Sequence, residues 1–368
     1  MLRILPKRKS ISFSTNWRGY KPIAAKTRFG SEDAAMIGER DLIDELSRIF
    51  GLPPPQVVCG IGDDAAVIAK QGGEYLLWTV DALIEKVHFD LAYMPLRQLG
   101  RKALAVNLSD IAAMGGKPRY ALLALGWPPE RDLSGALELA RGMQEVAQET
   151  GVTVIGGDTV SSPGSLSMSL TVLGQVKKEE LLRRDGAQIG ELIYLTGPVG
   201  LAAAGLETLR RGLTLTETER TLLLQAFFDP QPQILAARVL ARNHLATALI
   251  DLSDGVASDL FQICRRSNVG AVVESTLIPV PAPVAEVAAQ IGKDPLELAL
   301  KGGEDYLLLF TSPPDREKAL YLHFSEAGLG TPICIGKIVR GNRVWLRRPE
   351  ATQDISGMGF DHFRLKEL

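Results

Sequence analysis

GIGDDAAVI (residues 60–68) places Asp63 and Asp64 in a glycine-containing turn, directly before an apolar run that is typical of a buried strand. The same arrangement, an acidic residue beside an apolar strand-like run, recurs along the chain. It is found in YLLWTVDAL (75–83), VNLSDIAAMGG (106–116), VTVIGGDT (152–159) and ALIDLSDGV (248–256). A carboxylate at the mouth of a buried strand is unfavourable unless something compensates its charge. The repetition predicts that these acidic residues share one compensating partner.

A cluster of divalent cations fits this role, because hard ions such as Mg²⁺ take oxygen ligands and usually bring phosphate with them. The acidic residues concerned are Asp63, Asp64, Asp81, Asp110, Asp158, Asp251 and Asp254. Each of them alone could be an ordinary turn or helix N-cap aspartate, because Asp favours both positions. The set as a whole predicts a metal–phosphate site.

The composition is that of a globular protein of ordinary kind. The 368 residues are 46% hydrophobic and 23% charged, and they suffice for two domains that each have a core. A net charge of −2 and 6% aromatic residues give no general attraction for nucleic acid or an anionic membrane. No uncharged apolar run reaches the roughly 18 residues of a spanning helix. We therefore expect neither nucleic acid nor a membrane as a partner.

The cysteines and the N-terminus bear on the compartment. Three separated cysteines without a CxxC pair fit a reducing cytoplasm. Residues 1–31 hold eight Lys or Arg and no acidic residue, which is typical of a transit peptide. The alternative is that translation starts at Met36, because an amphipathic helix and the globular pattern begin there. We favour the second explanation and treat residues 1–35 as a basic extension outside the folded domains.

The rest of the chain predicts an α/β fold of two domains in tandem. The charged, turn-rich segment 177–191 separates an N-terminal domain, residues 36–178, from a C-terminal domain, residues 179–368. In the first we expect strands at 65–70, 74–82, 119–127, 152–156 and 165–176, and helices near 95–114 and 130–150. In the second we expect strands at 191–197, 246–253, 270–275, 332–339 and 343–348, and helices near 200–212, 216–227, 231–243, 255–267 and 314–327.

Several familiar catalytic motifs are absent from the sequence. The chain has no GxxxxGK[ST] loop, no strand–GxGxxG–helix unit and no GxSxG elbow, and its four histidines show no metal-binding spacing. TGPVGLAAAG (196–205) follows a strand and opens a helix, where backbone N–H groups could bind an anion. Packing glycines are the alternative explanation for that stretch. The chemistry that remains depends on oxygen ligands.

Two turns in the C-terminal half favour such chemistry. DLSDG places Asp251 and Asp254 three residues apart at a strand-to-helix turn, with Ser253 between them, so both carboxylates can point into one crevice. Asp254 could instead be the N-cap of the following helix. KGGEDY places Glu304 and Asp305 after two glycines, which allow the backbone to approach a ligand closely, although an ordinary turn into a strand explains them equally well.

Six motifs together resemble a known family. GIGDDAAVI, VDALIEKVHF, KALAVNLSDIAAMGGKP, VIGGDT, IDLSDG and GGEDY occur in the order and spacing of the thiamine-monophosphate kinases, within the aminoimidazole-ribonucleotide-synthetase-like superfamily. The resemblance covers roughly residues 36–368 and ends with GFDHF (359–363). It implies an N-terminal mixed-sheet domain that dimerises through its sheet, giving a homodimer, and a C-terminal α/β domain. It also implies Mg²⁺-dependent in-line transfer of the ATP γ-phosphoryl group to thiamine monophosphate, which yields thiamine diphosphate and ADP.

The resemblance also assigns roles to single residues. Several Mg²⁺ ions are expected at Asp64, Thr79, Asp81, Asp110, Asp158, Asp251 and Asp254, of which Asp64, Asp110, Asp251 and Asp254 are central to catalysis. ATP contacts are expected at Gly157, Asp158, Arg184 and Ser253, and contacts with thiamine monophosphate at His88, Glu304 and Phe360. These roles suit phosphoryl transfer, which depends on positioning and charge neutralisation. Because the acceptor phosphate oxygen is already ionised at neutral pH, no protein base is needed.

The chain departs from the family pattern in two places. Val80 stands where many relatives carry a hydroxyl, and residues 160–165 lack the basic residue that often follows GGDT. Two other functions are kept as alternatives. One is another ATP-dependent enzyme of the superfamily, such as a selenophosphate or aminoimidazole ribonucleotide synthetase-like enzyme, and the other is a non-catalytic nucleotide-binding protein.

Overall fold

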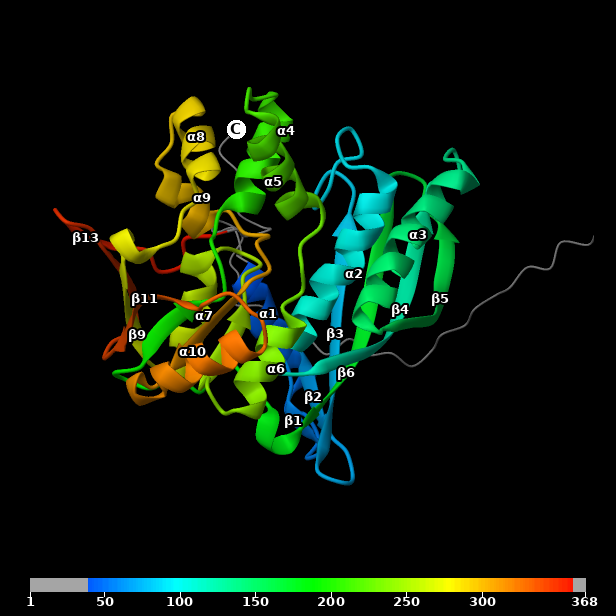
Figure 1. The fold of residues 1–368 in the computed structure, drawn as a ribbon. Helices are drawn as coiled ribbons and strands as arrows, with labels where there is room; N and C mark the ends of the chain where they lie inside the picture. Colours follow the sequence, from blue (N-terminus) through cyan, green and yellow to red (C-terminus); the bar gives the residue numbers. More distant parts are fainter. Residues whose placement is uncertain (1–38, 360–368) are drawn as a thin grey trace, which may run out of the picture.

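The computed structural model describes residues 39–359, which form two domains of mixed α/β structure (Figure 1). The helix α1 (Glu39–Phe50) precedes an N-terminal sheet of six strands in the order β1-β2-β3-β6-β4-β5. These strands are β1 (Val57–Cys59), β2 (Ala66–Ala69), β3 (Glu74–Ile84), β4 (Lys117–Trp127), β5 (Thr153–Ser161) and β6 (Ser167–Lys177). Among them, only β4 and β5 are parallel neighbours. The predicted α/β class is confirmed, whereas the extension 1–35 lies outside the described residues.

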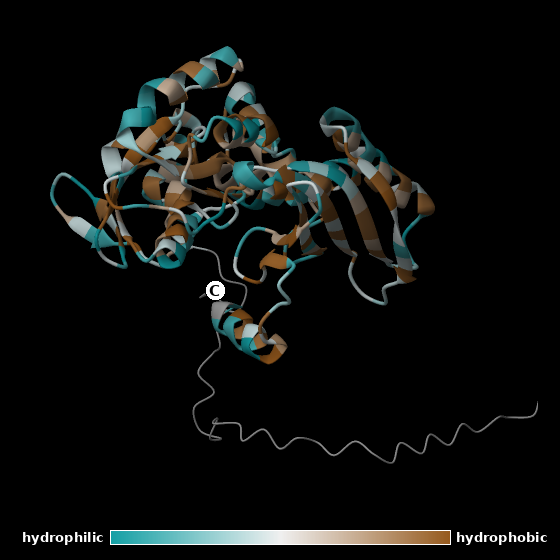
Figure 2. Cartoon of the chain, turned by 90° about the horizontal axis from the view of Figure 1, so that it is seen from below, coloured by the Kyte–Doolittle hydropathy of each residue, from teal (hydrophilic) through white to brown (hydrophobic). Residues whose placement is uncertain are grey.

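Helices cover one face of this sheet. The helices α2 (Leu96–Ala113) and α3 (Leu133–Thr150) pack against each other and against the strands. Along β3, Leu77 and Thr79 are buried on the helix side, whereas Trp78 and Val80 are 45% and 61% exposed on the other side. Figure 2 shows hydrophobic stretches along these strands. Because strand residues alternate between faces, the sheet keeps a partly apolar face, which we call the open face, that no described element covers.

The C-terminal domain contains a seven-stranded sheet in the order β13-β12-β9-β11-β7-β10-β8. Its strands are β7 (Leu192–Leu195), β8 (Ala248–Asp251), β9 (Gly270–Glu274), β10 (Leu308–Ser312), β11 (Ile333–Val339), β12 (Val344–Arg347) and β13 (Thr352–Asp354). Its helices are α4 (Leu201–Arg211), α5 (Glu217–Phe228), α6 (Ile234–Arg242), α7 (Val256–Ser267), α8 (Ala282–Gln290), α9 (Pro295–Lys301) and α10 (Glu317–Glu326). In β7, Ile193 packs into a core with α7, whereas the next residue, Tyr194, packs into a core with α6 and α10. Both faces of this sheet are therefore covered.

Helix α2 links the two domains. It contacts α5, α6 and β8 of the C-terminal domain as well as its own sheet. Arg101 on α2 donates two hydrogen bonds to Asp229, at 2.9 and 3.1 Å. Further along the same helix, Ser109 Oγ donates to Asp251 Oδ2 at 2.6 Å. Side chains along most of α2 therefore reach the C-terminal domain.

Most predicted helices and strands are found with small shifts of their ends. One difference bears on the site: β5 continues through Gly157 and Asp158 to Ser161, whereas the predicted strand ended at Gly156. The strands β1 and β13 and the helices α8 and α9 were not predicted. The segment 177–191 connects β6 to β7 and contains a short 3-10 turn at Lys178–Glu180.

Among the helices of residues 39–359, none combines the length and the apolar composition that crossing a membrane requires.

Candidate active site

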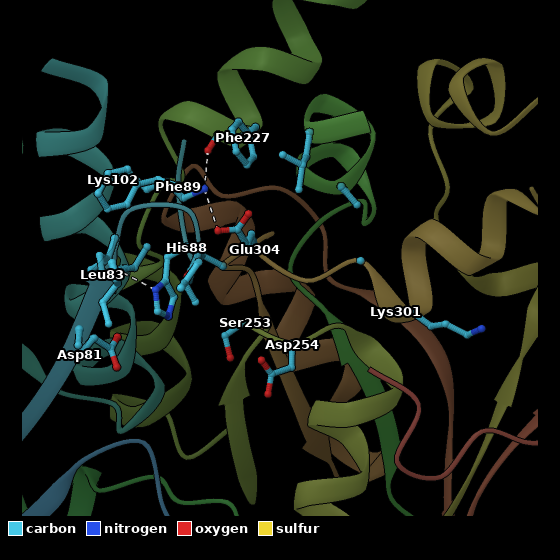
Figure 3. A pocket seen from close by; sticks show the side chains of 18 of the residues that line it. Asp81, Leu83, His88, Phe89, Lys102, Phe227, Ser253, Asp254, Lys301 and Glu304 are labelled. Atoms are coloured by element: carbon cyan, nitrogen blue, oxygen red, sulfur yellow. Dashed lines mark hydrogen bonds and ion pairs between the residues drawn. The ribbon is translucent and has the colours of Figure 1, made fainter. Parts of the chain in front are cut away.

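A crevice of about 1230 Å³ lies between the two domains. Its walls come from β3 and α2 of the N-terminal domain, from Arg184 in the connecting segment, and from α4, α9 and the turns DLSDG and GGEDY of the C-terminal domain. Figure 3 shows Asp81, Ser253 and Asp254 toward one end of this crevice, and Lys102, Phe227 and Glu304 toward the other. We call the first the acidic end and the second the Glu304 end.

Three predicted carboxylates converge at the acidic end. Asp64, Asp110 and Asp251 each offer an oxygen atom, and these atoms all lie within 4.8 Å of one another. The hydroxyl of Thr79 donates to Asp110 Oδ2 at 2.5 Å, and Ser109 Oγ donates to Asp251 Oδ2. The three residues come from the turn before β2, from α2 and from the end of β8, so the two domains build the cluster together.

Burial and mutual repulsion raise the pKa of Asp251, Asp110 and Asp81. Burial, and next the charge of Asp64, raise the pKa of Asp251 from 3.8 to about 8. Burial together with the charge of Asp81 raises the pKa of Asp110 well above its usual range, and burial also raises the pKa of Asp81. Such groups are fully ionised at neutral pH only when a cation lies beside them. An all-oxygen set this close together fits a hard divalent cation such as Mg²⁺.

Arg184 supplies a cation to this cluster. Its Nε donates to Asp64 Oδ2 at 3.1 Å, its Nη2 donates to Asp64 Oδ1, and its backbone N–H donates to Asp63 Oδ2 at 3.3 Å. Burial alone would lower the pKa of Arg184, but the neighbouring carboxylates of Asp64 and Asp63 raise it further above its usual value. Because the Asp64 side chain is fully buried, Arg184 is the group that balances its charge.

The turn after β8 faces the same crevice. Asp254 lines it together with Ser253, whereas Asp251, whose carboxylate we also expected in the crevice, is buried and does not line it. The alternative role of Asp254 as a helix N-cap is wrong, because Gly255 occupies the N-cap position of α7. The backbone N–H of Asp254 donates to Asp259 Oδ2 at 3.1 Å. Asp259 is buried on the first turn of α7 and fixes this turn from behind, a role that the sequence analysis missed.

The expected contacts with thiamine monophosphate lie in different parts of the chain. His88 lines the crevice in the turn after β3, where its Nδ1 accepts the backbone N–H of Ile84 at 3.0 Å. Glu304 lines the Glu304 end. Phe360 lies outside the described residues. The structure therefore brings His88 and Glu304 into one crevice with the acidic cluster.

The GGEDY turn has an unusual backbone conformation. Glu304 and Tyr306 have φ values of 62° and 47°, in the left-handed region that non-glycine residues rarely adopt. Two backbone hydrogen bonds hold this shape: Glu304 N–H donates to Ser253 O, and Tyr306 N–H donates to Leu252 O, each at 2.9 Å. A strained backbone fixed by its surroundings is common at binding sites. The turn that carries Glu304 is thus tied to the turn that carries Ser253.

Asp305 binds the backbone N–H groups of TGPVGLAAAG (196–205), the stretch for which the sequence left an anion site and packing glycines as alternatives. Its carboxylate accepts the backbone N–H groups of Gly200 at 2.7 Å and Ala202 at 3.3 Å, at the N-terminus of α4. An anion does sit at this helix end, as its dipole favours, but the anion is a side chain of the same chain. The glycine-containing turn therefore anchors the GGEDY turn.

Gly157 and Asp158 do not join the acidic cluster within one chain. Across the sheet, Asp158 of β5 pairs with Ala124 of β4, Ala124 pairs with Ser169 of β6, and Ser169 pairs with Ala82 of β3. This row lies on the open face, whereas Asp81 lies in the neighbouring row on the helix side. A bulge explains the placement, because the register of β5 shifts between Val154 and Gly156. One extra residue turns every later side chain of a strand to the other face.

Lys102 is a further crevice residue to which the sequence analysis gave no role. Its side chain is only 2% exposed, and its Nζ lies 2.9 Å from Glu304 Oε1. A signal exists in the sequence, since KALAVNLSD places a lysine on a helix whose neighbouring positions are apolar. Long charged residues are almost never fully buried unless they are paired.

Comparisons with known proteins agree in pointing to one family. Residues 62–176 match the family described as AIR synthase related protein, N-terminal domain, and residues 188–347 match the corresponding C-terminal domain. The chain is 36% identical to the thiamine-monophosphate kinase of Synechococcus elongatus over 87% of this chain and 98% of that protein. It is 32% identical to the thiamine-monophosphate kinase of Bacillus subtilis over 88% of this chain and all of that protein.

Solved structures are similar as well. A structure described as AaThiL complexed with AMPPCP and TMP has a TM-score of 0.76 and 30% identity, over 89% of this chain and 97% of that one. The thiamine-monophosphate kinase of Stenotrophomonas maltophilia has a TM-score of 0.69 and 35% identity, over 83% of this chain and 95% of that one. A HypE–HypF complex, at 20% identity and a TM-score of 0.68, shares the fold alone.

Proposed function

This chain belongs to the thiamine-monophosphate kinase family within the AIR synthase related proteins, and we propose that it transfers the ATP γ-phosphoryl group to thiamine monophosphate. The products are thiamine diphosphate and ADP. The observation that carries the proposal is the convergence of Asp64, Asp110 and Asp251 at the crevice between the two domains, which Asp64 and Asp110 line and behind which Asp251 is buried. The crevice volume of about 1230 Å³ exceeds the roughly 300–1,000 Å³ of a site for one small molecule, which supports two bound substrates.

Several Mg²⁺ ions are proposed at the acidic end, held by Asp64, Asp81, Asp110, Asp251 and Asp254, with Thr79 beside them. When bound, they would neutralise the charge of the two phosphate groups, which is the main barrier to phosphoryl transfer. Thr79 and Ser109 orient the carboxylates through their hydroxyl groups. Arg184 and Ser253 are proposed to contact ATP, and the Arg184 guanidinium suits phosphate oxygens. The ionised acceptor phosphate attacks without a protein base.

The thiamine part of the substrate is proposed to bind at the Glu304 end. Glu304 lines that end and His88 lines the same crevice, and a carboxylate can pair with the cationic thiazolium or accept from the aminopyrimidine. Phe360 lies outside the described residues, so its contact with the substrate stays a prediction. This arrangement would direct the phosphate of thiamine monophosphate toward the acidic end and the ATP γ-phosphoryl group.

We propose further that the enzyme is a homodimer that pairs the open faces of two sheets. The exposure of Trp78 and Val80 supports this, because monomers rarely leave a wide apolar sheet face uncovered. In such a dimer, Gly157 and Asp158 of one chain would approach the crevice of the other, which would reconcile their expected ATP and metal contacts with their position. A reducing compartment, the cytoplasm, is proposed because Cys59, Cys264 and Cys334 are free thiols.

The direct test is to incubate the purified protein with ATP, Mg²⁺ and thiamine monophosphate and to follow the products by chromatography. We expect thiamine diphosphate and ADP to appear in equal amounts and to vanish with EDTA. ADP without thiamine diphosphate would indicate another acceptor and would contradict the proposal. Binding of ATP by folded protein without any turnover would contradict it as well.

A further inference from the structure

The buried lysine of α2 is the feature from which we draw a further role. The ammonium group of Lys102 makes three contacts. It forms an ion pair with Glu304 Oε1 and donates a hydrogen bond to the backbone carbonyl of Phe227, each at 2.9 Å, and it lies 3.9 Å from the centre of the Phe227 ring (Figure 3). The lysine belongs to the N-terminal domain and all three partners belong to the C-terminal domain. Lys102 is therefore held between the domains, at the Glu304 end of the crevice.

A charged lysine in this position needs its partners. Removing an ammonium group from water is unfavourable unless hydrogen bonds and an opposite charge replace the water. Here a carboxylate, a carbonyl and an aromatic face do so, and an aromatic face attracts cations. The Lys102 side chain is 2% exposed, whereas that of Glu304 is 29% exposed. The pair is thus asymmetric, with the lysine inside and the carboxylate facing the crevice.

The position of Glu304 is fixed at both of its ends. Its backbone is held in the left-handed region by the hydrogen bond from its N–H to Ser253 O. Its carboxylate is held by Lys102 through Oε1. A carboxylate has about four lone-pair sites on its two oxygens, so the ion pair with Lys102 through one oxygen leaves acceptor capacity for a ligand. The exposed part of the group is therefore presented to the crevice in one orientation.

We propose that Lys102 is a positioning residue for thiamine monophosphate, and that it acts by holding the Glu304 carboxylate toward the thiamine part of the substrate. The inference rests on the proposed function and deepens it. The crevice also contains the carboxylates of the acidic end, which attract divalent cations. Pairing with Lys102 partly neutralises Glu304, which keeps it from acting as another metal ligand and reserves it for the organic substrate. ATP and its phosphates, at the other end, do not depend on this pair.

The test uses Lys102→Met, Glu304→Gln and the double variant in the full-length protein. Lys337→Met is the matched control, because Lys337 is an exposed lysine on β11 and does not line the crevice. For each protein, KM for both substrates and kcat are measured with saturating Mg²⁺. Binding of thiamine monophosphate without ATP is measured by calorimetry. Turnover by the unmodified protein is measured first, so that a failure of the proposed function is recognised separately.

We expect Lys102→Met to raise KM and Kd for thiamine monophosphate by about tenfold or more, equivalent to about 1.4 kcal/mol. KM for ATP and kcat should stay within about threefold, because an interaction made equally in the ground and transition states affects binding alone. Glu304→Gln should produce a similar rise. The double variant should have a KM no higher than that of Glu304→Gln, because two residues that act through one interaction are not additive.

Three results would overturn the proposal. The first is an unchanged KM for thiamine monophosphate in folded Lys102→Met. The second is an equal loss for both substrates, which a purely structural role of Lys102 between the domains predicts. The third is a double variant whose defect is the product of the single defects. If Lys102→Met does not fold, the comparison of the double variant with Glu304→Gln decides, because loss of both partners leaves no unpaired buried charge.

Discussion

The Arg184 guanidinium donates to both carboxylate oxygens of Asp64, through Nε to Oδ2 at 3.1 Å and through Nη2 to Oδ1. Asp64 belongs to the N-terminal domain, and Arg184 belongs to the segment that connects the domains. Arg184 thus binds the carboxylate of Asp64, which is also a proposed metal ligand. Metal binding and the position of Arg184 should therefore be coupled.

Replacement of Arg184 by Gln should reveal this coupling. Without divalent ions, we expect a loss of unfolding free energy on the order of 3 kcal/mol, because the buried Asp64 loses its counterion. Added Mg²⁺ should restore more stability to the variant than to the unmodified protein, because no side chain must leave the cluster. Thermal melts in EDTA and in Mg²⁺ measure both effects. Arg343→Gln, which removes an exposed pair with Asp354, is the control. An identical Mg²⁺ response in the two proteins would show that Arg184 and metal do not compete.

Replacing the carboxylates of the acidic end tests the proposed metal site. Asp110→Asn and Asp251→Asn should each lower kcat by about a hundredfold or more, because charge stabilisation supplies most of the rate in phosphoryl transfer. Both variants should stay folded, since Asn keeps the size of Asp and relieves the repulsion among buried carboxylates. The measurement is product formation alongside a melting curve in EDTA. Asp315→Asn is the control, because Asp315 is exposed and does not line the crevice. Near-normal turnover in either cluster variant would contradict the proposed metal site.

The raised pKa of Asp251 predicts a pH dependence of stability in the absence of metal. The pKa of Asp251 is about 8 in the folded protein, against 3.8 in the unfolded chain. Below about pH 4 the group is protonated in both states and has no effect on stability. As the pH rises above that value, the unfolded chain releases the proton first, so stability is lost progressively until about pH 8. In EDTA, the melting temperature of Asp251→Asn minus that of the unmodified protein should therefore increase from about pH 5 to about pH 8. A difference that stays constant with pH would show that Asp251 titrates normally.

Much of this site could be predicted from the order of residue types along the chain. Asp64, Asp110 and Asp251 each adjoin an apolar run, and elements that pack together bring such neighbours together. Lys102 could not be assigned, because its partners Glu304 and Phe227 lie far along the chain and meet it only through the packing of the domains. The same holds for Asp305, whose role depends on the position of α4.

The side of the sheet on which Asp158 lies could not be predicted either, for a different reason. The bulge between Val154 and Gly156 has no clear mark in VTVIGGDT, although it decides the face. Without the extra residue, the alternation would place Asp158 on the same face as Asp81. One local irregularity thus separates a residue from the cluster to which its motif assigns it.

The open face offers a test of the proposed dimer. Val80→Glu places a charge at a residue that is 61% exposed in one chain and would be buried between two open faces. We expect the variant to be a monomer by light scattering, because burying an unpaired charge opposes association. Leu322→Glu is the matched control, because Leu322 is 55% exposed on α10, in the other domain. A Val80→Glu protein that stays dimeric would show that the chains associate elsewhere.

Mixed dimers test whether Asp158 serves the crevice of the partner chain. Asp158→Asn and Asp251→Asn should each be inactive alone, because every site then lacks one ligand. In a dimer of one Asp158→Asn chain and one Asp251→Asn chain, one of the two crevices would have an intact Asp251 from its own chain and an intact Asp158 from the other. Random reassembly of equal amounts makes half of the dimers mixed, so about a quarter of the normal activity should return. Unfolding and refolding the two proteins together, with each alone as the control, provides the measurement. If Asp158 instead acted within its own chain, both crevices of every mixed dimer would be defective and no activity would return.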